Sequence, residues 1–196
     1  MSAEQKSIDP TPLGNITTGI VLLTLWPILF GAADTTAMIA VLPWSAMAFP
    51  LVLLTSVIAF RHGHVLGAVA NGVMSGLTLC QNAVWAIVLI VYQCSGKDVP
   101  VAVMAVKGYV DGAAYLGAAF MLLCIAIIFC RLKNTTMALS MFIIFLGFCC
   151  MGVSDLGLFH LRLPAALCIT CFALWMIYSG CAMLAHDTLG RKMLPY

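Results

Sequence analysis

Residues 64–92, HVLGAVANGVMSGLTLCQNAVWAIVLIVY, form one long apolar segment that contains no Asp, Glu, Lys or Arg. A helix needs about 20 such residues to cross the hydrocarbon core of a bilayer. The segment is therefore expected to be a membrane-spanning helix, and the rest of the chain can be interpreted from it.

Small polar side chains recur along this segment at helical spacing. Four of them, at i, i+4, i+7 and i+11, lie on one side of an α-helix and are called the polar line: Asn71, Ser75, Thr78 and Asn82. Met74 and Gln81 lie beside the line. Polar side chains inside a membrane normally face a water-filled path, or they form hydrogen bonds that hold a helix bundle together. Both interpretations remain open at this point.

The composition extends the membrane assignment to the whole chain. Of its 196 residues 63% are hydrophobic and 8% are charged, and the mean hydropathy is +1.10. Six apolar spans are expected, at residues 12–30, 36–60, 65–92, 108–130, 137–153 and 164–185. The predicted fold class is thus an all-α integral membrane protein with six transmembrane helices (12–185), flanked by terminal segments 1–11 and 186–196.

The positions of lysine and arginine predict the orientation. Six of these residues share the side of the two termini: Lys6, Arg61, Arg131, Lys133, Arg191 and Lys192. Three lie on the opposite side: Lys97, Lys107 and Arg162. Because cytoplasmic loops carry the excess of positive residues, both termini are expected in the cytoplasm. The longest loop is expected at residues 93–107.

Nothing in the sequence predicts an enzyme, a metal site or a cofactor. Eight of the nine cysteines fall within or beside apolar spans, where thiols behave as small hydrophobes. Cys168 and Cys171 form a CxxC pair without a second pair at zinc-site spacing. No basic patch suggests a nucleic-acid partner.

Prolines and glycines predict where helices bend and where they approach one another. Three prolines inside spans are expected to kink them: Pro27, Pro43 and Pro50. The pairs Gly72/Gly76 and Gly108/Gly112 form small-xxx-small motifs, which allow close helix packing within one protomer or between protomers.

Several motifs together resemble a known family. Residues 9–14, DPTPLG, are similar to the NPxPLGL signature that opens the acetate uptake transporter family, of the succinate-acetate permease type. Further landmarks are residues 61–67 (RHGHVLG), Tyr115-Leu116-Gly117, Leu132-Lys133 with Ala138-Leu139, and Arg191 with Leu194-Pro195. The resemblance covers nearly the whole chain.

The resemblance implies a six-helix protomer that assembles as a hexamer, with a pathway through each protomer for acetate, succinate and similar acids. The family narrows this pathway with a Phe, a Tyr and a Leu. The matching positions here are Thr18, Met74 and, within two residues, Leu146. Two of the three depart from the pattern, which implies a diverged member.

The expected function is therefore a cell-membrane channel or transporter for small carboxylates. The expected partners are a small organic anion, membrane lipid and further copies of the chain. The start of the first helix, with its positive dipole end, is expected to favour an anion. The candidate pathway residues are Pro12, Leu13, Gly14, Asn15, Thr18, Asn71, Met74, Ser75, Thr78 and Leu146. The alternatives are a channel for a neutral solute (undissociated acid, amide or ammonia) and a non-transporting scaffold or sensor.

Asp111 is the one acid expected below the outer surface. Lys107 precedes it by one helical turn, so that the two are expected to form an ion pair. A role of Asp111 in proton coupling is the alternative.

Overall fold

The computed structural model describes residues 9–189, and this part of the chain is helical apart from its connections, with no strand. The elements are α1 (Thr11–Thr24), α2 (Trp26–Leu29), the 3-10 turn η1 (Thr35–Ala37), α3 (Met38–Arg61), α4 (Val65–Val73), the π-helix η2 (Met74–Cys80), α5 (Gln81–Cys94), α6 (Val101–Arg131), α7 (Thr135–Asp155) and α8 (Arg162–Leu189). The family landmark at Arg191, Leu194 and Pro195, most of the segment 186–196, and residues 1–8 lie outside the described residues.

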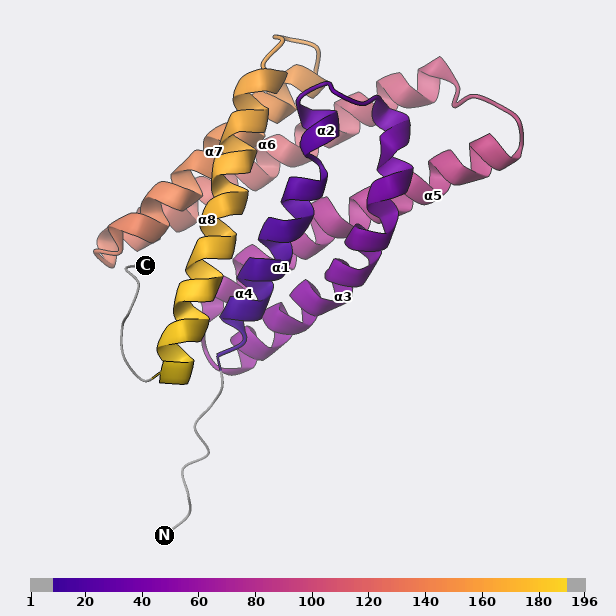
Figure 1. Cartoon of the computed structure of the whole chain (residues 1–196). Coiled ribbons are helices and arrows are strands. Elements are labelled where there is room, and N and C mark those ends of the chain that lie inside the picture. Colours follow the sequence, from indigo (N-terminus) through magenta and orange to yellow (C-terminus); the bar gives the residue numbers. More distant parts are fainter. Residues whose placement is uncertain (1–8, 190–196) are drawn as a thin grey trace.

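These elements form six helical rods: α1 with α2, α3, α4–η2–α5, α6, α7 and α8 (Figure 1). Within the described residues, five rods are long and apolar enough to cross a membrane. The first is divided into two shorter helices. Together with the composition, these five rods make the protein an integral membrane protein. The structure does not place the chain in a bilayer, so the crossing of all six rods stays a prediction.

The division of the first rod follows from Pro27. α1 ends at Thr24 and α2 begins at Trp26, with Pro27 in its first turn. Proline is tolerated at this position because the first N–H groups of a helix have no partner within it. The expected interruption at Pro27 is thus confirmed. α3, by contrast, continues unbroken through Pro43 and Pro50.

α6 begins earlier than the sequence analysis placed it. The connection between α5 and α6 is residues 95–100, and α6 starts at Val101 directly after Pro100. The expected loop 93–107 is therefore wrong. Pro100 stands at the N-cap of α6 and marks the start of the helix. Lys107 consequently lies inside the helix.

The third rod contains a π-helix that the periodicity did not predict. Met74 to Cys80 adopts i→i+5 geometry between two α-helical halves. The polar line therefore crosses a change of helix type at its centre. Short π-segments within α-helices occur frequently at functional sites.

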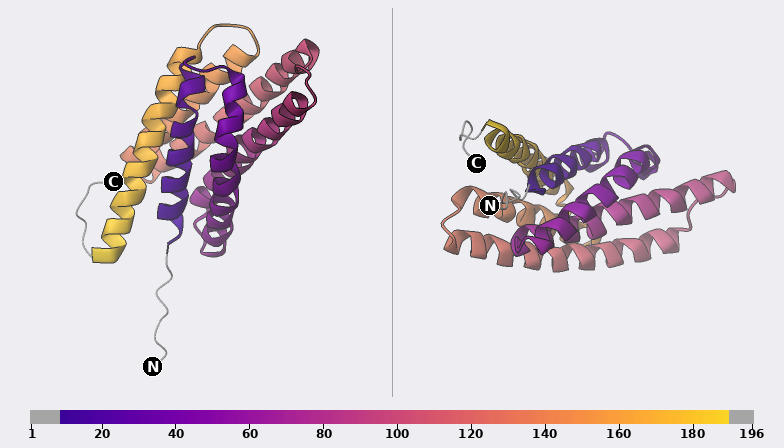
Figure 2. Two further views of the ribbon diagram at one scale, coloured as in Figure 1. Left: turned by 45° about the vertical axis from the view of Figure 1, so that its right-hand side comes forward. Right: turned by 90° about the horizontal axis from the view of Figure 1, so that it is seen from below.

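The rods are arranged as two groups with α1 between them (Figure 2). One group consists of α3, α4, η2 and α5, and the other of α6, α7 and α8. α1 packs against α3 on one side and α8 on the other. α6 runs along α7 and approaches the first group mainly at α4.

Glycines allow the closest helix contacts. A Cβ on Gly19 of α1 would lie 2.6 Å from the carbonyl oxygen of Ala173 on α8. A Cβ on Gly180 would lie 2.9 Å from the carbonyl oxygen of Pro12. These distances are shorter than van der Waals contact, so α1 and α8 can pack this closely only with glycine at both positions.

The two small-residue motifs have different surroundings. A Cβ on Gly112 would lie 2.9 Å from the carbonyl oxygen of Gly152 on α7, so its expected close packing is confirmed within the protomer. Gly108 and Gly72 also face neighbouring helices. Gly76 has no described neighbour within 4 Å of such a Cβ and lies at the surface.

We predict that Gly112→Leu lowers the melting temperature of the detergent-solubilised protein, because the new side chain would force α6 away from α7. Overpacking of this kind typically costs about 1–3 kcal/mol. Gly117→Leu is the matched control: it changes the same residue type on the same helix, at an exposed site with open space around it. Equal losses in the two variants would contradict this account of the α6–α7 contact.

Candidate functional site

A cavity of about 170 Å³ opens at the end of the bundle opposite the α3–α4 and α6–α7 turns. All six rods contribute to its wall. The lining residues are Leu22, Leu25, Ile28, Leu29, Met38, Thr78, Gln81, Asn82, Trp85, Lys107, Asp111, Tyr115, Phe148, Met151, Asp155, Arg162 and Ile169. Residues beside the connections 30–37, 95–100 and 156–161 line it. These connections are expected on the side of the membrane opposite the termini, so we call it the outer cavity.

The polar groups of the outer cavity are balanced in charge. Lys107 and Asp111 come from α6, Asp155 from the end of α7 and Arg162 from the start of α8. Thr78, Gln81 and Asn82 belong to the third rod and carry uncharged donors and acceptors. The cavity can therefore contact a polar solute on several sides without presenting a strong net field.

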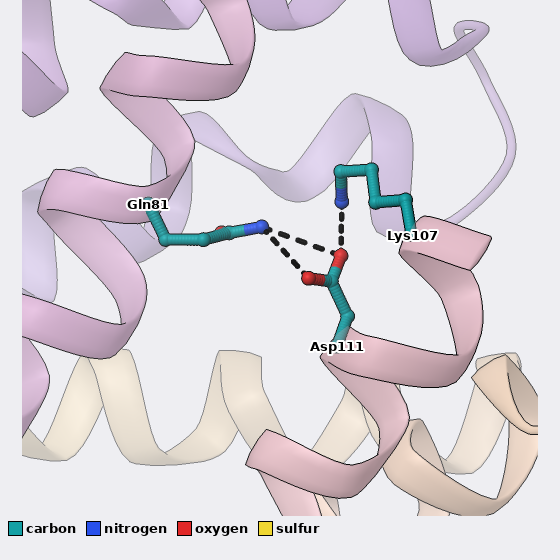
Figure 3. A network of polar contacts seen from close by, with 3 residues as sticks. All are labelled: Gln81, Lys107 and Asp111. Atoms are coloured by element: carbon teal, nitrogen blue, oxygen red, sulfur yellow. Dashed lines mark hydrogen bonds and ion pairs between the residues drawn. The ribbon is translucent and has the colours of Figure 1, made fainter. Parts of the chain in front are cut away.

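One hydrogen-bond network joins the two groups of helices across this cavity (Figure 3). The Gln81 Nε2 donates to both carboxylate oxygens of Asp111, at 3.3 Å each. Lys107 forms the expected ion pair with Asp111, and its Nζ lies 4.8 Å from the centroid of the Trp85 ring. The pair is thus confirmed. The sequence analysis did not foresee the bond to Gln81.

An apolar plug lies below the cavity. It consists of buried residues of one core cluster: Leu22, Met74, Phe148, Ile169 and Phe172. On the third rod, Met74 lies between Thr78 and Asn71, and Thr78 lines the cavity. On the first rod, Leu22 lies between Leu25 and Thr18, and Leu25 lines the cavity. The plug therefore separates the outer cavity from polar residues deeper in the bundle.

The structure places the three expected constriction residues differently. Met74 is buried in the plug. Leu146 is 40% exposed on α7, so it does not join the buried residues around Met74. Phe148, two residues further on, is 2% exposed and packs edge-on against Tyr115, with 5.4 Å between ring centroids. The position of the expected Leu therefore stays a prediction, within two residues of Leu146.

Thr18 and the motif at the start of α1 lie among polar side chains at the other end of the plug. The Asn15 Nδ2 donates to the Ser179 Oγ on α8 at 3.3 Å. A Cβ on Gly14 would lie 3.2 Å from the Asn71 Oδ1, so the motif and the polar line meet here. Thr18 is fully buried, and its hydroxyl has no hydrogen-bond partner among the described residues. We call Asn15, Thr18, Asn71 and Ser179 the inner polar cluster.

The start of α1 offers no backbone donor for an anion. The Thr11 N–H donates to Asp9 Oδ1 at 2.9 Å, the N–H groups of Leu13 and Gly14 donate to the carbonyl oxygen of Pro10, and Pro12 has no N–H. The expected preference of this helix end for an anion stays a prediction, and it would have to act through the helix dipole without a free N–H group. Leu13 is also exposed, whereas Pro12 is buried.

The polar line itself serves two purposes. The Ser75 Oγ donates to the carbonyl oxygen of Phe49 on α3 at 3.2 Å, a bond between helices of the kind that the packing interpretation requires. The Thr78 Oγ1 donates to the carbonyl oxygen of Met74 in its own rod. Asn71 and Asn82 are only 4% and 8% exposed, and their side chains form no hydrogen bond with any described residue. Their amides are therefore available to water or a solute.

Sequence reasoning missed the cavity side of α6, α7 and α8. Tyr115, Phe148, Asp155 and Arg162 line the cavity but were not proposed for the pathway. A usable signal was present: Lys107, Asp111, Asp155 and Arg162 were all assigned to the same side of the membrane, and together they make two opposite charge pairs.

The fold and the cavity define a class: an α-helical membrane protein of six rods with a polar cavity on the bundle axis. No family model matches the sequence, and no curated protein gives a significant match to it. A solved structure of the bacterial acetate channel SatP has the same fold, with a TM-score of 0.75 at 16% sequence identity. The similarity covers 97% of this chain and 99% of that channel.

We predict that Asn71→Leu and Ser75→Ala affect different properties. Asn71→Leu should reduce solute flux in liposomes and leave the melting temperature nearly unchanged, because no hydrogen bond with a described residue is lost. Ser75→Ala removes the bond to Phe49 and should cost about 1 kcal/mol of stability with little effect on flux. If Asn71→Leu instead lowered stability and spared flux, Asn71 would be a packing residue.

Proposed function

We propose that this protein is a diverged member of the acetate uptake transporter family that conducts small carboxylates through each protomer. The observation that carries the proposal is the order of groups through the bundle: an outer cavity with a mostly apolar wall and a few polar and charged groups, the apolar plug that forms its floor, and the inner polar cluster. The fold shared with an acetate channel supports it. Under this proposal both termini are cytoplasmic, and the chain forms a homo-oligomer, for which a hexamer is the expectation from the resemblance.

The physical argument concerns the hydration of the solute. A carboxylate is ionised at neutral pH, and its transfer into hydrocarbon without compensating donors costs many kcal/mol. In the outer cavity Lys107, Gln81 and Asn82 can replace part of its water. In the inner polar cluster the donors are the Asn71 amide and the Thr18 hydroxyl. Weak donors of this kind favour rapid passage over tight binding.

The side chains of the plug can form a hydrophobic gate that opens easily. Leu22 and Met74 have flexible side chains, and hydrophobic constrictions in channels open and close through wetting. A small solute can pass such a constriction by rotamer changes without movement of the helices. Under this interpretation the plug controls the size of the solute, and the polar groups on either side control its chemistry.

A second candidate is a channel for a neutral solute. The outer cavity has balanced charges, with Lys107 and Arg162 beside Asp111 and Asp155. The Gln81 Oε1 is buried without a partner among the described residues and can accept a hydrogen bond from an amide or an undissociated acid. The two candidates differ in how flux follows the ionisation of the solute.

We expect flux through liposomes carrying the protein to follow the concentration of the carboxylate anion. Acetate uptake should persist at pH 7.5, where only a very small fraction of acetic acid is undissociated. Protein-free liposomes supply the background, and acetamide tests neutral permeation. Flux that follows only the undissociated acid across a pH series, together with rapid acetamide uptake, would favour the second candidate.

We also expect the plug to set the size limit. Phe148→Leu should increase the flux of three- and four-carbon acids relative to acetate, because it removes part of a ring from the plug. Leu146→Ala changes an exposed position of the same helix and should leave this ratio unchanged. If both variants behaved alike in a competition assay with the acid series, the pathway would not pass Phe148.

A further inference from the structure

The donors of the outer cavity are already directed at a carboxylate, that of Asp111. Gln81 reaches it from α5 and binds both of its oxygens, while Lys107 binds it from the preceding turn of α6 (Figure 3). Lys107 is held from a further direction by the face of Trp85. An ammonium and an amide N–H that converge on one carboxylate form the arrangement expected of a binding site for a carboxylic acid anion.

Asp111 and an incoming solute would therefore need the same two donors. Lys107, Gln81 and Asp111 all line the cavity, so a solute in it meets the network directly. The side chains of Lys107 and Asp111 are 23% and 15% exposed, which leaves both within reach of the cavity. Because the pair keeps some contact with the cavity, a second carboxylate can compete with Asp111 for both donors.

We propose that Asp111 is a tethered competitor for solute carboxylates, which bind the outer cavity by taking Lys107 and Gln81 from it. The inference rests on the proposed function and adds the binding residues and their regulation. The tethered carboxylate keeps the donors oriented when no solute is present. It also weakens solute binding, so that the solute can leave toward the plug.

The experiment is to measure half-saturating acetate for uptake into proteoliposomes carrying the full chain with Asp111→Asn or Asp155→Asn. Each change removes one negative charge from the same cavity at nearly constant volume, but only the first releases Lys107 from its ion pair. Asp111→Asn should lower half-saturating acetate about two- to fivefold, as expected for loss of a partly solvated competitor. Asp155→Asn should produce a clearly smaller shift, through the electric field alone.

Two further measurements test the mechanism. Gln81→Leu in the Asp111→Asn background should reverse part of the gain, because it removes a donor that the solute now uses. Acetamide uptake should not distinguish the two proteins.

Several outcomes would overturn the inference. Equal shifts in the Asp111 and Asp155 variants would show that charge alone matters. Loss of acetate uptake in Asp111→Asn, with normal melting, would show that Asp111 assists transport and does not compete. If acetate uptake by wild type is robust but the variants do not differ from it, only this inference fails. Wild-type liposomes that pass none of the acids contradict the proposed function as well.

Discussion

The close approach of α1 to its neighbours is the constraint on which the rest of the structure depends. Gly19 and Gly180 bring the backbones of α1 and α8 together, and Gly14 brings α1 against Thr55 and Asn71 of the other helix group. α1 thereby connects the two groups on one side of the bundle, whereas the backbones of α5 and α6 stay apart. The outer cavity occupies the space between the two groups, so its width is determined by how closely α1 packs elsewhere.

Much of this arrangement could be predicted from the sequence. Apolar length identified six helical rods, and helical spacing placed the polar line on one buried side, because both signals are local and strong. The ion pair of Lys107 and Asp111 followed from a separation of four residues. The start of α6 was expected too late, because residues 93–107 were assigned to one loop, although Pro100 directly precedes the helix. The choice between Leu146 and its neighbours cannot be made from the sequence, because a shift of two residues on a helix exchanges its two sides, and no charge or turn on α7 marks the register.

The candidate site was harder to predict than the fold because it depends on contacts between rods. Asn71 and Ser75 look equivalent in the sequence, yet Ser75 is satisfied by a carbonyl of α3, whereas Asn71 lies against a glycine. The two ends of the axis also share a property that sequence alone does not reveal. Asp9 occupies the first free N–H of α1, and Asp111 occupies the donors of the outer cavity. The protein's own carboxylates thus take strong anion-binding groups at both ends, which is consistent with weak binding of solutes.

The π-helix has a consequence for how this chain can be aligned with other proteins of the same fold. A π-segment accommodates one extra residue while the α-helical halves on either side, here α4 and α5, keep their own packing. One residue corresponds to about 100° of rotation on an α-helix. Consider a protein of the same fold whose third rod is α-helical throughout. If no gap is allowed inside membrane helices, an alignment with that protein pairs one half of this rod with residues on the wrong side of the other helix. The correct alignment carries a single-residue gap between Met74 and Cys80, and correspondences for Asn71 and for Gln81 must then be established separately.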